Sequence, residues 1–402
     1  CIPVNILTAT AAFFLIMSVP KLATAQPSAT RSWTVVHFMP DDFDGADTKN
    51  LEPGQFPSAA FDVEDASAPA VLTSPAIDAA FQFDQLLFSA DVLLPGGGSM
   101  AAEAQVKTGD GWSPWFSFGT FAPGAGASVK GQQNEFGKVD VDLLRLAKKA
   151  TAFRYRVTLK SGSKPASLRL AAATYTDSSL PYAPAEAQAR SYDFAPLELA
   201  APSRSQMIQQ VNYAGDICSP VSMTMALGAL GLKAEPISTA ASVLDASESI
   251  YGNWFFNTAY AGTRGLYAFL ARLNTLEDAR AFLQAGAPVI ASVTFGPDEL
   301  DNAPLKKTKG HLLLITGFTP KGDVITHDPA APDEKTVTRV YRRDQFAAAW
   351  LGNKFGTSYI LAKDLSRLMA VKDKVAELYS APPSGDGDRA KLIETQLVFN
   401  ER

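Results

Sequence analysis

The chain has 402 residues, of which 47% are hydrophobic and 19% are charged, and its formal net charge is −5. This length predicts two or three domains with cores of their own. The acidic balance excludes a typical nucleic-acid-binding protein, which presents a basic face. Because only three histidines and two cysteines are present, a Cys/His zinc site is not expected, and no cofactor is implied.

An apolar segment opens the chain. Residues 6–20 form an apolar run that is too short for a comfortable membrane span. A small-residue cleavage site of the A-x-A type ends at Ala25, which predicts a signal peptide over residues 1–25, truncated at its start. The alternative is a buried N-terminal helix. We therefore expect a secreted or periplasmic protein with no stable membrane span after the signal is removed.

Residues 31–177 alternate between apolar and polar side chains with a period of two. In residues 152–159 and again in residues 102–106, every second side chain is apolar, and Gly- and Pro-rich turns such as residues 95–98 separate such stretches. This pattern predicts an antiparallel β-sandwich domain. Trp112 and Trp115 flank one turn, where they form either a sugar or peptide platform or ordinary packing.

A linker rich in Pro and Ala is predicted over residues 178–204. The domain that follows, residues 205–381, mixes helix and strand signals, and residues 382–402 read as a flexible C-terminal segment. Apolar, β-rich runs predict strands at residues 289–295 and 312–318.

Three helices are predicted in this second domain. Ser219 is the expected N-cap of the first, which Gly231 ends. The spacing of Leu266, Leu270 and Leu273 predicts a second helix. A cap formed by Thr275 and Asp278 predicts a third, which stops at Gly286 before Pro288.

Cys218 is the only cysteine that remains once the predicted signal peptide, which contains Cys1, is set aside. A single thiol cannot form an internal disulfide, so it forms an intermolecular bridge, is buried and inert, or is reactive. Its place at the start of a predicted helix favours the third possibility, because the helix dipole stabilises a thiolate and lowers the pKa of the thiol.

A predicted hairpin supplies an imidazole and a carboxylate. His311 begins an apolar strand that turns at residues 319–322 and returns toward Asp328. With the turn centred between residues 320 and 321, Leu313 lies opposite Asp328. His311 and Asp328 are then diagonal neighbours on one face, roughly 7–8 Å apart at the backbone, and His327 points to the other face. A bulge in either strand would reverse this expectation.

These residues also have ordinary structural interpretations. Cys218 could be a small buried residue, and His311 could be a core histidine whose ring nitrogens are hydrogen-bonded. Asp328 precedes a proline and could simply initiate a turn. Four aromatic residues either line a substrate cleft or fill a core; they are Trp254, Phe255, Phe256 and Tyr260.

Residues 203–365 resemble papain-like cysteine peptidases of the bacteriocin-leader-processing (double-glycine peptidase) type, especially their exported relatives with an N-terminal β-domain. The order and spacing of several short stretches carry this resemblance. They are Ser205-Gln206-Met207, Cys218-Ser219-Pro220, Gly252-Asn253-Trp254, Thr258-Ala259-Tyr260-Ala261-Gly262, Gly310-His311-Leu312 and Asp328-Pro329-Ala330.

The resemblance implies a role for each candidate residue. Cys218 would be the nucleophile, His311 the general base and then acid, and Asp328 the group that orients the imidazole. A glutamine upstream of the cysteine donates to the oxyanion in such peptidases, and Gln206 matches it best. Such a donor is worth on the order of 10²–10³ in rate.

The identity of the oxyanion donor and the shape of the subsite beside the thiol are left open by the sequence. Gln209 and Gln210 are rivals for the oxyanion role. Some relatives have Gly directly after the nucleophile and an aromatic residue directly before it, whereas this chain has Ser219 and Ile217. Asp216 would oppose thiolate formation if it pointed inward, and it is expected to face solvent.

The expected protein is therefore an α+β papain-like cysteine peptidase domain preceded by an antiparallel β-sandwich domain. It would cleave a peptide or related amide bond through an acyl-enzyme, on a peptide or peptidoglycan-type substrate. The alternatives are a cell-wall amidase or acyl transferase on the same scaffold, and a non-catalytic glycan- or peptide-binding protein with a relic peptidase domain. The sequence leaves open the oligomeric state and the role of the β-domain.

Overall fold

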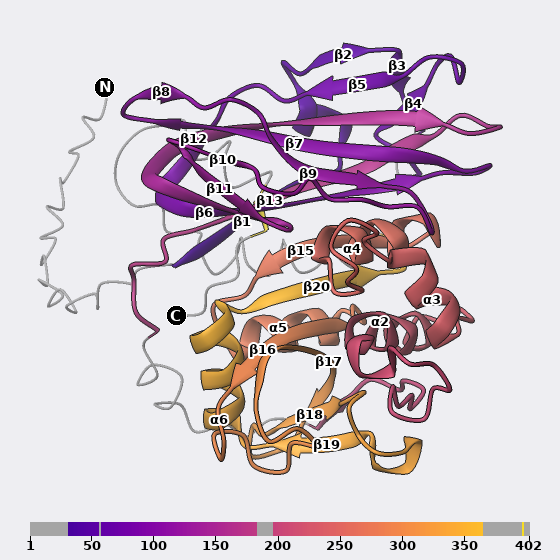
Figure 1. The fold of residues 1–402 in the computed structure, drawn as a ribbon, viewed down its shortest axis with the longest axis vertical. Helices are drawn as coiled ribbons and strands as arrows, with labels where there is room; N and C mark the ends of the chain where they lie inside the picture. Colours follow the sequence, from indigo (N-terminus) through magenta and orange to yellow (C-terminus); the bar gives the residue numbers. More distant parts are fainter. Residues whose placement is uncertain (1–30, 56–57, 183–195, 365–395, 398–402) are drawn as a thin grey trace, which may run out of the picture.

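The computed structural model describes residues 31–55, 58–182, 196–364 and 396–397. The expected signal peptide, residues 183–195 of the expected linker and nearly all of the expected C-terminal segment lie outside these residues. The described part of the chain forms two sheets, of 14 and 7 strands, and helices pack with the second (Figure 1). No helix among these residues is both long enough and apolar enough to cross a bilayer.

The first sheet is built almost entirely from the N-terminal half of the chain. Its strands are β1 (Ser32–His37), β2 (Asp47–Lys49), β3 (Leu51–Pro53), β4 (Phe61–Val63), β5 (Ala70–Thr73), β6 (Ile77–Leu93), β7 (Gly98–Thr108), β8 (Gly111–Trp112), β9 (Phe116–Phe121), β10 (Gln133–Asn134), β11 (Gly137–Asp140), β12 (Leu143–Ser161), β13 (Ser167–Thr176) and β21 (Gln396–Leu397). A short 3-10 helix, η1 (Pro40–Phe43), follows β1.

The pairing of β12 divides this sheet into two groups of strands. Residues 143–153 of β12 pair with β6, whereas residues 152–161 pair with β7 and residues 156–159 with β5. All of these pairings are antiparallel, and the apolar side chains expected to share one face of residues 152–159 are at most 2% exposed. An antiparallel, β-rich N-terminal domain is thereby confirmed.

The predicted turn at residues 95–98 connects β6 to β7. Gly96, Gly97 and Gly98 all have positive φ angles, of 115°, 87° and 117°, which glycine adopts without a steric penalty.

Beside the next turn, the two tryptophans pack against arginines of β12. The guanidinium of Arg154 lies 4.9 Å from the ring centre of Trp112, and that of Arg156 lies 4.3 Å from the ring centre of Trp115. These contacts favour the packing interpretation of both rings over an open platform.

The second sheet has the strand order β15-β20-β16-β17-β18-β19, and β14 pairs with β17. The elements are β14 (Leu197–Glu198), η2 (Ala214–Asp216), α2 (Cys218–Ala229), α3 (Pro236–Val243), α4 (Trp254–Thr263), β15 (Tyr267–Arg272), α5 (Leu276–Gln284), β16 (Val289–Phe295), β17 (Thr308–Phe318), β18 (Val324–His327), η3 (Glu334–Thr336), β19 (Thr338–Tyr341), α6 (Arg343–Ala347), η4 (Ala348–Gly352) and β20 (Thr357–Ala362). Because β14 lies within the expected linker, this sheet begins before residue 205.

The helix predicted from Leu266, Leu270 and Leu273 is wrong, because the structure has strand β15 there. Every residue of β15 is buried, since the strand lies between β20 and the N-terminal domain. An apolar run that is buried on both faces shows neither strand alternation nor a polar helix face, so spacing alone does not identify it.

The other two helix predictions hold with one shift. Helix α2 begins at Cys218, two residues early, because Ile217 instead of Ser219 is its N-cap, and the amide of Val221 donates to Ile217 O at 3.0 Å. The hydroxyl of Ser219 does not cap the helix but lies 2.9 Å from the hydroxyl of Tyr359. The predicted cap of α5 is confirmed, with reciprocal hydrogen bonds between Thr275 and Asp278.

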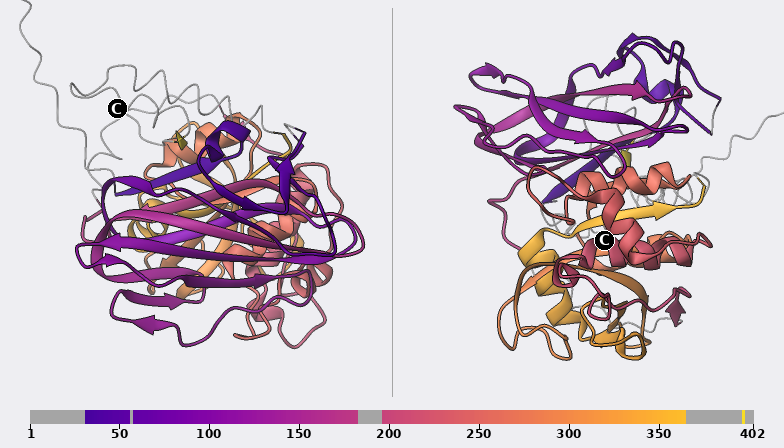
Figure 2. Two further views of the ribbon diagram at one scale, coloured as in Figure 1. Left: turned by 90° about the horizontal axis from the view of Figure 1, so that it is seen from above. Right: turned by 45° about the vertical axis from the view of Figure 1, so that its right-hand side comes forward.

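The two domains share a continuous boundary. In Figures 1 and 2, β15 and α4 lie at the side of the second domain that faces β6 and β13. Each of the two hydrophobic core clusters contains residues from both domains. Helix α4 also receives its N-terminal cap partly from the other domain, because the carboxylate of Asp142 accepts the amide hydrogen of Trp254.

Side chains of the N-terminal domain hydrogen-bond the free edge of β15. The donors and acceptors come from β6 and β13. The pairs are Arg169 Nη1 to Leu266 O at 3.0 Å, Ala268 N to Asp91 Oδ2 at 3.3 Å, Leu270 N to Ser89 Oγ at 2.9 Å and Thr174 Oγ1 to Leu270 O at 3.1 Å. An exposed strand edge invites pairing with other chains, and these contacts cover it.

Candidate active site

The hairpin of β17 and β18 keeps the predicted register next to His311 and Asp328, although its turn and one pairing step differ from the prediction. The turn contains three residues instead of two, because Thr319 N donates to Asp323 O at 2.9 Å. A register shift then occurs between Ile315 and Gly317. The shift offsets the longer turn, so Leu314 pairs with His327 as the predicted register requires.

His311 and Asp328 meet at the end of this hairpin. His311 Nε2 lies 2.8 Å from Asp328 Oδ1, and both side chains are almost fully buried. The amide of Ala330 donates to the same oxygen at 2.9 Å, and the hydroxyl of Tyr341 donates to Oδ2 at 2.7 Å. The carboxylate is therefore held by three donors, one of which is the imidazole.

Cys218 lies at the first turn of α2, which packs against β17 (Figure 1). The imidazole of His311 forms a hydrogen bond with the thiol, and the amide of Leu312 donates to it as well. Because Nε2 of His311 is engaged by Asp328, the ring nitrogen that faces the sulfur is Nδ1. Thiol, imidazole and carboxylate form one series of hydrogen bonds.

These contacts set the charge state of the three groups. Burial alone would raise the pKa of Cys218, but the hydrogen bond and charge of His311 outweigh it, so this pKa lies below its ordinary value. Burial opposes a charged imidazole, yet the Asp328 carboxylate and the thiol raise the pKa of His311 to about 10. Burial likewise opposes the Asp328 charge, and His311 and Tyr341 overcome it and lower the pKa of Asp328. The arrangement favours a thiolate beside an imidazolium.

Gln206 lies beside the segment that precedes the thiol, but its amide is already engaged. Its Nε2 donates to Ala214 O at 3.0 Å and to Gly215 O at 2.9 Å. Its backbone amide donates to Pro329 O at 2.8 Å, which ties it to the loop after Asp328. Both side-chain hydrogens are used, so Gln206 would have to release one of them to serve an oxyanion. That role stays a prediction.

The rival glutamines are placed differently. Gln209 Nε2 donates to Ser205 O at 2.9 Å, and Gln210 is exposed. Asp216 faces solvent, as expected. His327 lies 3.3 Å through Nδ1 from Pro202 O and not against Asp328.

The aromatic residues of α4 belong to the core rather than to a cleft. Phe255 and Phe256 are fully buried and Tyr260 is 5% exposed. The ring of Phe256 lies 5.8 Å from that of Phe121 in the N-terminal domain. Trp254 is half-buried and packs against the same core.

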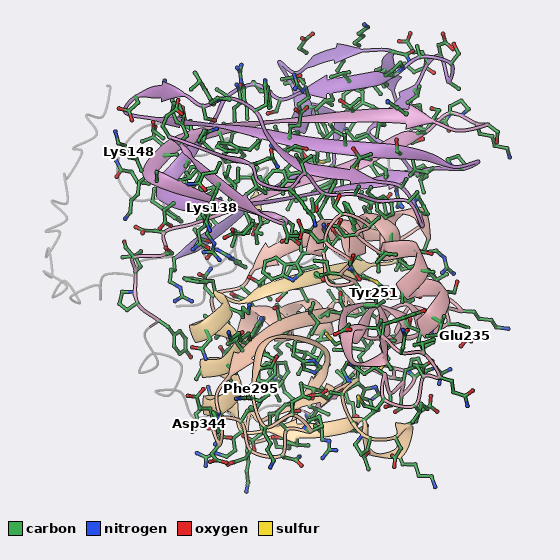
Figure 3. All side chains as sticks on the ribbon, viewed as in Figure 1. Lys138, Lys148, Glu235, Tyr251, Phe295 and Asp344 are labelled. Carbon is green, nitrogen blue, oxygen red and sulfur yellow. The ribbon has the colours of Figure 1, made fainter. Side chains whose placement is uncertain are left out.

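Apolar side chains are exposed next to Gln206. Met207 is 51% exposed and Ile208 is 48% exposed. Tyr213, in the loop that leads to Cys218, stacks on Tyr251 with ring centres 5.0 Å apart, and Tyr251 lies on the α2 side of the second domain (Figure 3). Met207, Ile208 and Tyr213 therefore place apolar side chains in the chain segment that precedes the thiol.

Sequence reasoning missed Tyr341. It is fully buried at the end of β19, and its hydroxyl contacts the carboxylate that orients His311. A tyrosine in a β-rich run is an ordinary core residue by its pattern, so only the three-dimensional pairing of β18 with β19 identifies the contact.

Comparison with known protein families gives two matches. Residues 198–358 match the model described as the Peptidase_C39 like family, and residues 45–178 match the model described as the Peptidase C39 N-terminal domain. No curated protein matches the chain.

Among solved structures, two of infectious bursal disease virus are similar to part of the chain. That of strain Gx has 15% sequence identity and a TM-score of 0.17, over 41% of this chain and 37% of that one. That of strain Gt has 13% identity and a TM-score of 0.18, over 41% of this chain and 36% of that one. The matched part thus spans little more than a third of those viral chains.

Proposed function

We propose that this chain, which has a region similar to the Peptidase_C39 like family and another similar to the Peptidase C39 N-terminal domain, is a cysteine peptidase of papain-like architecture. The reaction is hydrolysis of a peptide or related amide bond through Cys218, His311 and Asp328. The observation that carries the proposal is the pairing of His311 Nε2 with Asp328 Oδ1 at 2.8 Å, in an imidazole that acts directly on the Cys218 thiol. The lowered pKa of Cys218 and the raised pKa of His311 support it.

In the acylation step, the Cys218 thiolate attacks the carbonyl carbon of the scissile bond and forms a tetrahedral intermediate. His311 Nδ1, which carries the proton, transfers it to the departing amine as the C–N bond breaks, and a thioester remains. Asp328 stabilises the imidazolium before this transfer and holds Nε2 in place throughout.

In the deacylation step, neutral His311 takes a proton from water, and the resulting hydroxide attacks the thioester carbonyl. The C–S bond breaks, the carboxylic acid leaves, and the thiolate–imidazolium pair is restored. The negative oxygen of each intermediate is formed beside the first turn of α2, where main-chain amides lack partners within the helix and can donate.

The proposal includes a location and a substrate class. The apolar segment and cleavage site within residues 1–25 support export, to a secreted or periplasmic location. A peptide or peptidoglycan-type substrate would contact the exposed apolar side chains of Met207 and Ile208, and the Tyr213–Tyr251 pair. Apolar side chains of the substrate would then be preferred on that side of the scissile bond.

The test uses the full chain and a neutral alkylating reagent at pH 6, with labelling of Cys218 followed by peptide mass. Cys218 should react at least about tenfold faster than a free peptide thiol, because its lowered pKa gives it a larger thiolate fraction at that pH. His311→Ala should abolish this advantage. Reaction no faster than that of a peptide thiol would favour a non-catalytic binding protein.

Hydrolysis is tested separately with a mixture of peptides and peptidoglycan fragments. The wild-type chain should cleave some members, and Cys218→Ala should cleave none at a measurable rate. Retained cleavage by Cys218→Ala would refute the nucleophile assignment. Products that carry an added amine instead of a new carboxylate would identify acyl transfer on the same site.

A further inference from the structure

Tyr341 lies behind the proposed catalytic groups. Its hydroxyl donates to Asp328 Oδ2 at 2.7 Å, while His311 Nε2 lies 2.8 Å from Asp328 Oδ1. The tyrosine is fully buried, so water does not compete for this contact. The hydroxyl is thus placed to act on the carboxylate, and only through it on the imidazole.

The surroundings of Tyr341 keep its hydroxyl in one place. Tyr341 pairs with Val324 across β18 and β19. Its ring is nearly parallel to that of Phe346, with an interplanar angle of 14° and ring centres 5.9 Å apart. The amide of Asp328 donates to Val337 O at 2.9 Å, which holds the carboxylate backbone next to β19. Donor and acceptor are therefore both fixed by the same pair of strands.

The charges around the carboxylate make this donor important. Asp328 is faced by His311 from β17, by Tyr341 from β19 and by the amide of Ala330, and its own charge opposes ionisation of Cys218. Burial, together with Asp328, raises the pKa of Tyr341, and the nearby Arg339 opposes this weakly. The tyrosine therefore remains a protonated donor over the working pH range.

We propose that Tyr341 is a positioning residue for the reaction of Cys218, a role that rests on the proposed function. By donating to Oδ2 it fixes the plane of the Asp328 carboxylate, so that Oδ1 remains on His311 Nε2. It also keeps the buried carboxylate ionised. Without the hydroxyl, Oδ2 would be a buried acceptor with no side-chain donor, and the imidazolium would lose part of its stabilisation.

Tyr341→Phe removes one oxygen atom and tests this role. In the full chain, alkylation of Cys218 by iodoacetamide is measured from pH 3 to pH 9. The midpoint at which the thiolate forms should move upward by roughly half to one pH unit, because a weaker Asp328–His311 pair supports the thiolate less. On any peptide that the wild type cleaves, kcat/KM should fall about tenfold with KM nearly unchanged.

Tyr175→Phe is the matched control. Tyr175 is 1% exposed, and its hydroxyl accepts the amide hydrogen of Ala80 at 2.9 Å in the N-terminal domain. It should lose thermal stability to a similar extent while the alkylation midpoint stays at the wild-type value. An unmoved midpoint in folded Tyr341→Phe would overturn the positioning role.

A second variant covers the case in which Tyr341→Phe does not fold. Site-specific replacement of Tyr341 by 3-fluorotyrosine keeps the ring and makes the hydroxyl a stronger donor, so the midpoint should move downward. No movement would again overturn the proposal. Failure of the proposed function is distinguishable, because wild-type Cys218 would then react no faster than a peptide thiol.

Discussion

At the scale of single residues, burial and charge act against each other in the site. Burial destabilises each of the three charged forms, of Cys218, His311 and Asp328. The charges are maintained because each group is paired with the next, and because Tyr341 and Ala330 satisfy the remaining carboxylate positions. Removing one member therefore leaves the others as uncompensated buried charges.

This pairing predicts the pH dependence of peptide cleavage. As pH rises through the lowered pKa of Cys218, the thiolate–imidazolium pair forms and kcat/KM should rise. As pH rises through the raised pKa of His311, about 10, the imidazolium loses the proton that the leaving amine needs and kcat/KM should fall. A profile of kcat/KM from pH 4 to pH 11 checks both limbs. A fall centred near pH 6.5, the ordinary value for histidine, would contradict the paired state.

Besides its predicted oxyanion role, Gln206 holds the loop before Cys218 in place. Gln206→Ala leaves Ala214 O and Gly215 O without their donor, which should cost about 1–2 kcal/mol of unfolding free energy. Denaturant unfolding measures it, with Gln209→Ala, which removes a single hydrogen bond to Ser205 O, as the milder control. A Gln206→Ala variant with wild-type stability but about 10²-fold lower kcat would instead assign the side chain to the oxyanion.

At the scale of elements, local patterns predicted those parts whose surroundings are also local. The alternation of residues 152–159 and the cap of α5 were predictable from neighbouring residues, because a strand with one buried face alternates apolar and polar side chains and a capped helix carries its capping residues at its own start. Strand β15 was not, because its burial depends on β6 and β13, which lie about a hundred residues or more away in sequence.

The hairpin of β17 and β18 shows why a site can be predicted from an imperfect register. The expected two-residue turn was wrong by one residue, and a register shift near Thr316 was not expected. His311 and Asp328 still meet because the two departures cancel. Neither departure has a local signal: the turn matches a two-residue pattern, and the register shift lies where β17 also pairs with the distant strand β14.

The packing of α4 against β6 predicts an effect of Gly262. A Cβ at this position would overlap the carboxylate of Asp91, which is buried and hydrogen-bonded to Ala268 N. Gly262→Ala should therefore lower the unfolding free energy by about 1–3 kcal/mol, even though alanine favours a helix. Urea unfolding measures the loss. Gly252→Ala, where a Cβ meets nothing within 4 Å, should leave stability within about 0.5 kcal/mol.

At the scale of the whole molecule, the N-terminal domain helps to support the sheet that carries His311. The cores of the two domains are continuous. The free edge of β15 is hydrogen-bonded by the side chains of Arg169, Asp91, Ser89 and Thr174. β15 belongs to the same sheet as β17, which carries His311, and β20 and β16 lie between them. Loss of the support at β15 should therefore disturb the position of His311.

The second domain expressed alone, as residues 196–364, should therefore aggregate or populate oligomers. Removing residues 31–182 exposes the β15 edge and the apolar side of α4, and an unpaired strand edge pairs with other chains. Light scattering measures the assembly, and alkylation of Cys218 measures the loss of thiol reactivity. Co-expression of residues 26–182 as a separate chain supplies the missing hydrogen-bond partners. It should reduce the assembly and restore part of the thiol reactivity. A monomeric isolated domain that alkylates at the wild-type rate would show that the N-terminal domain serves the substrate rather than the sheet.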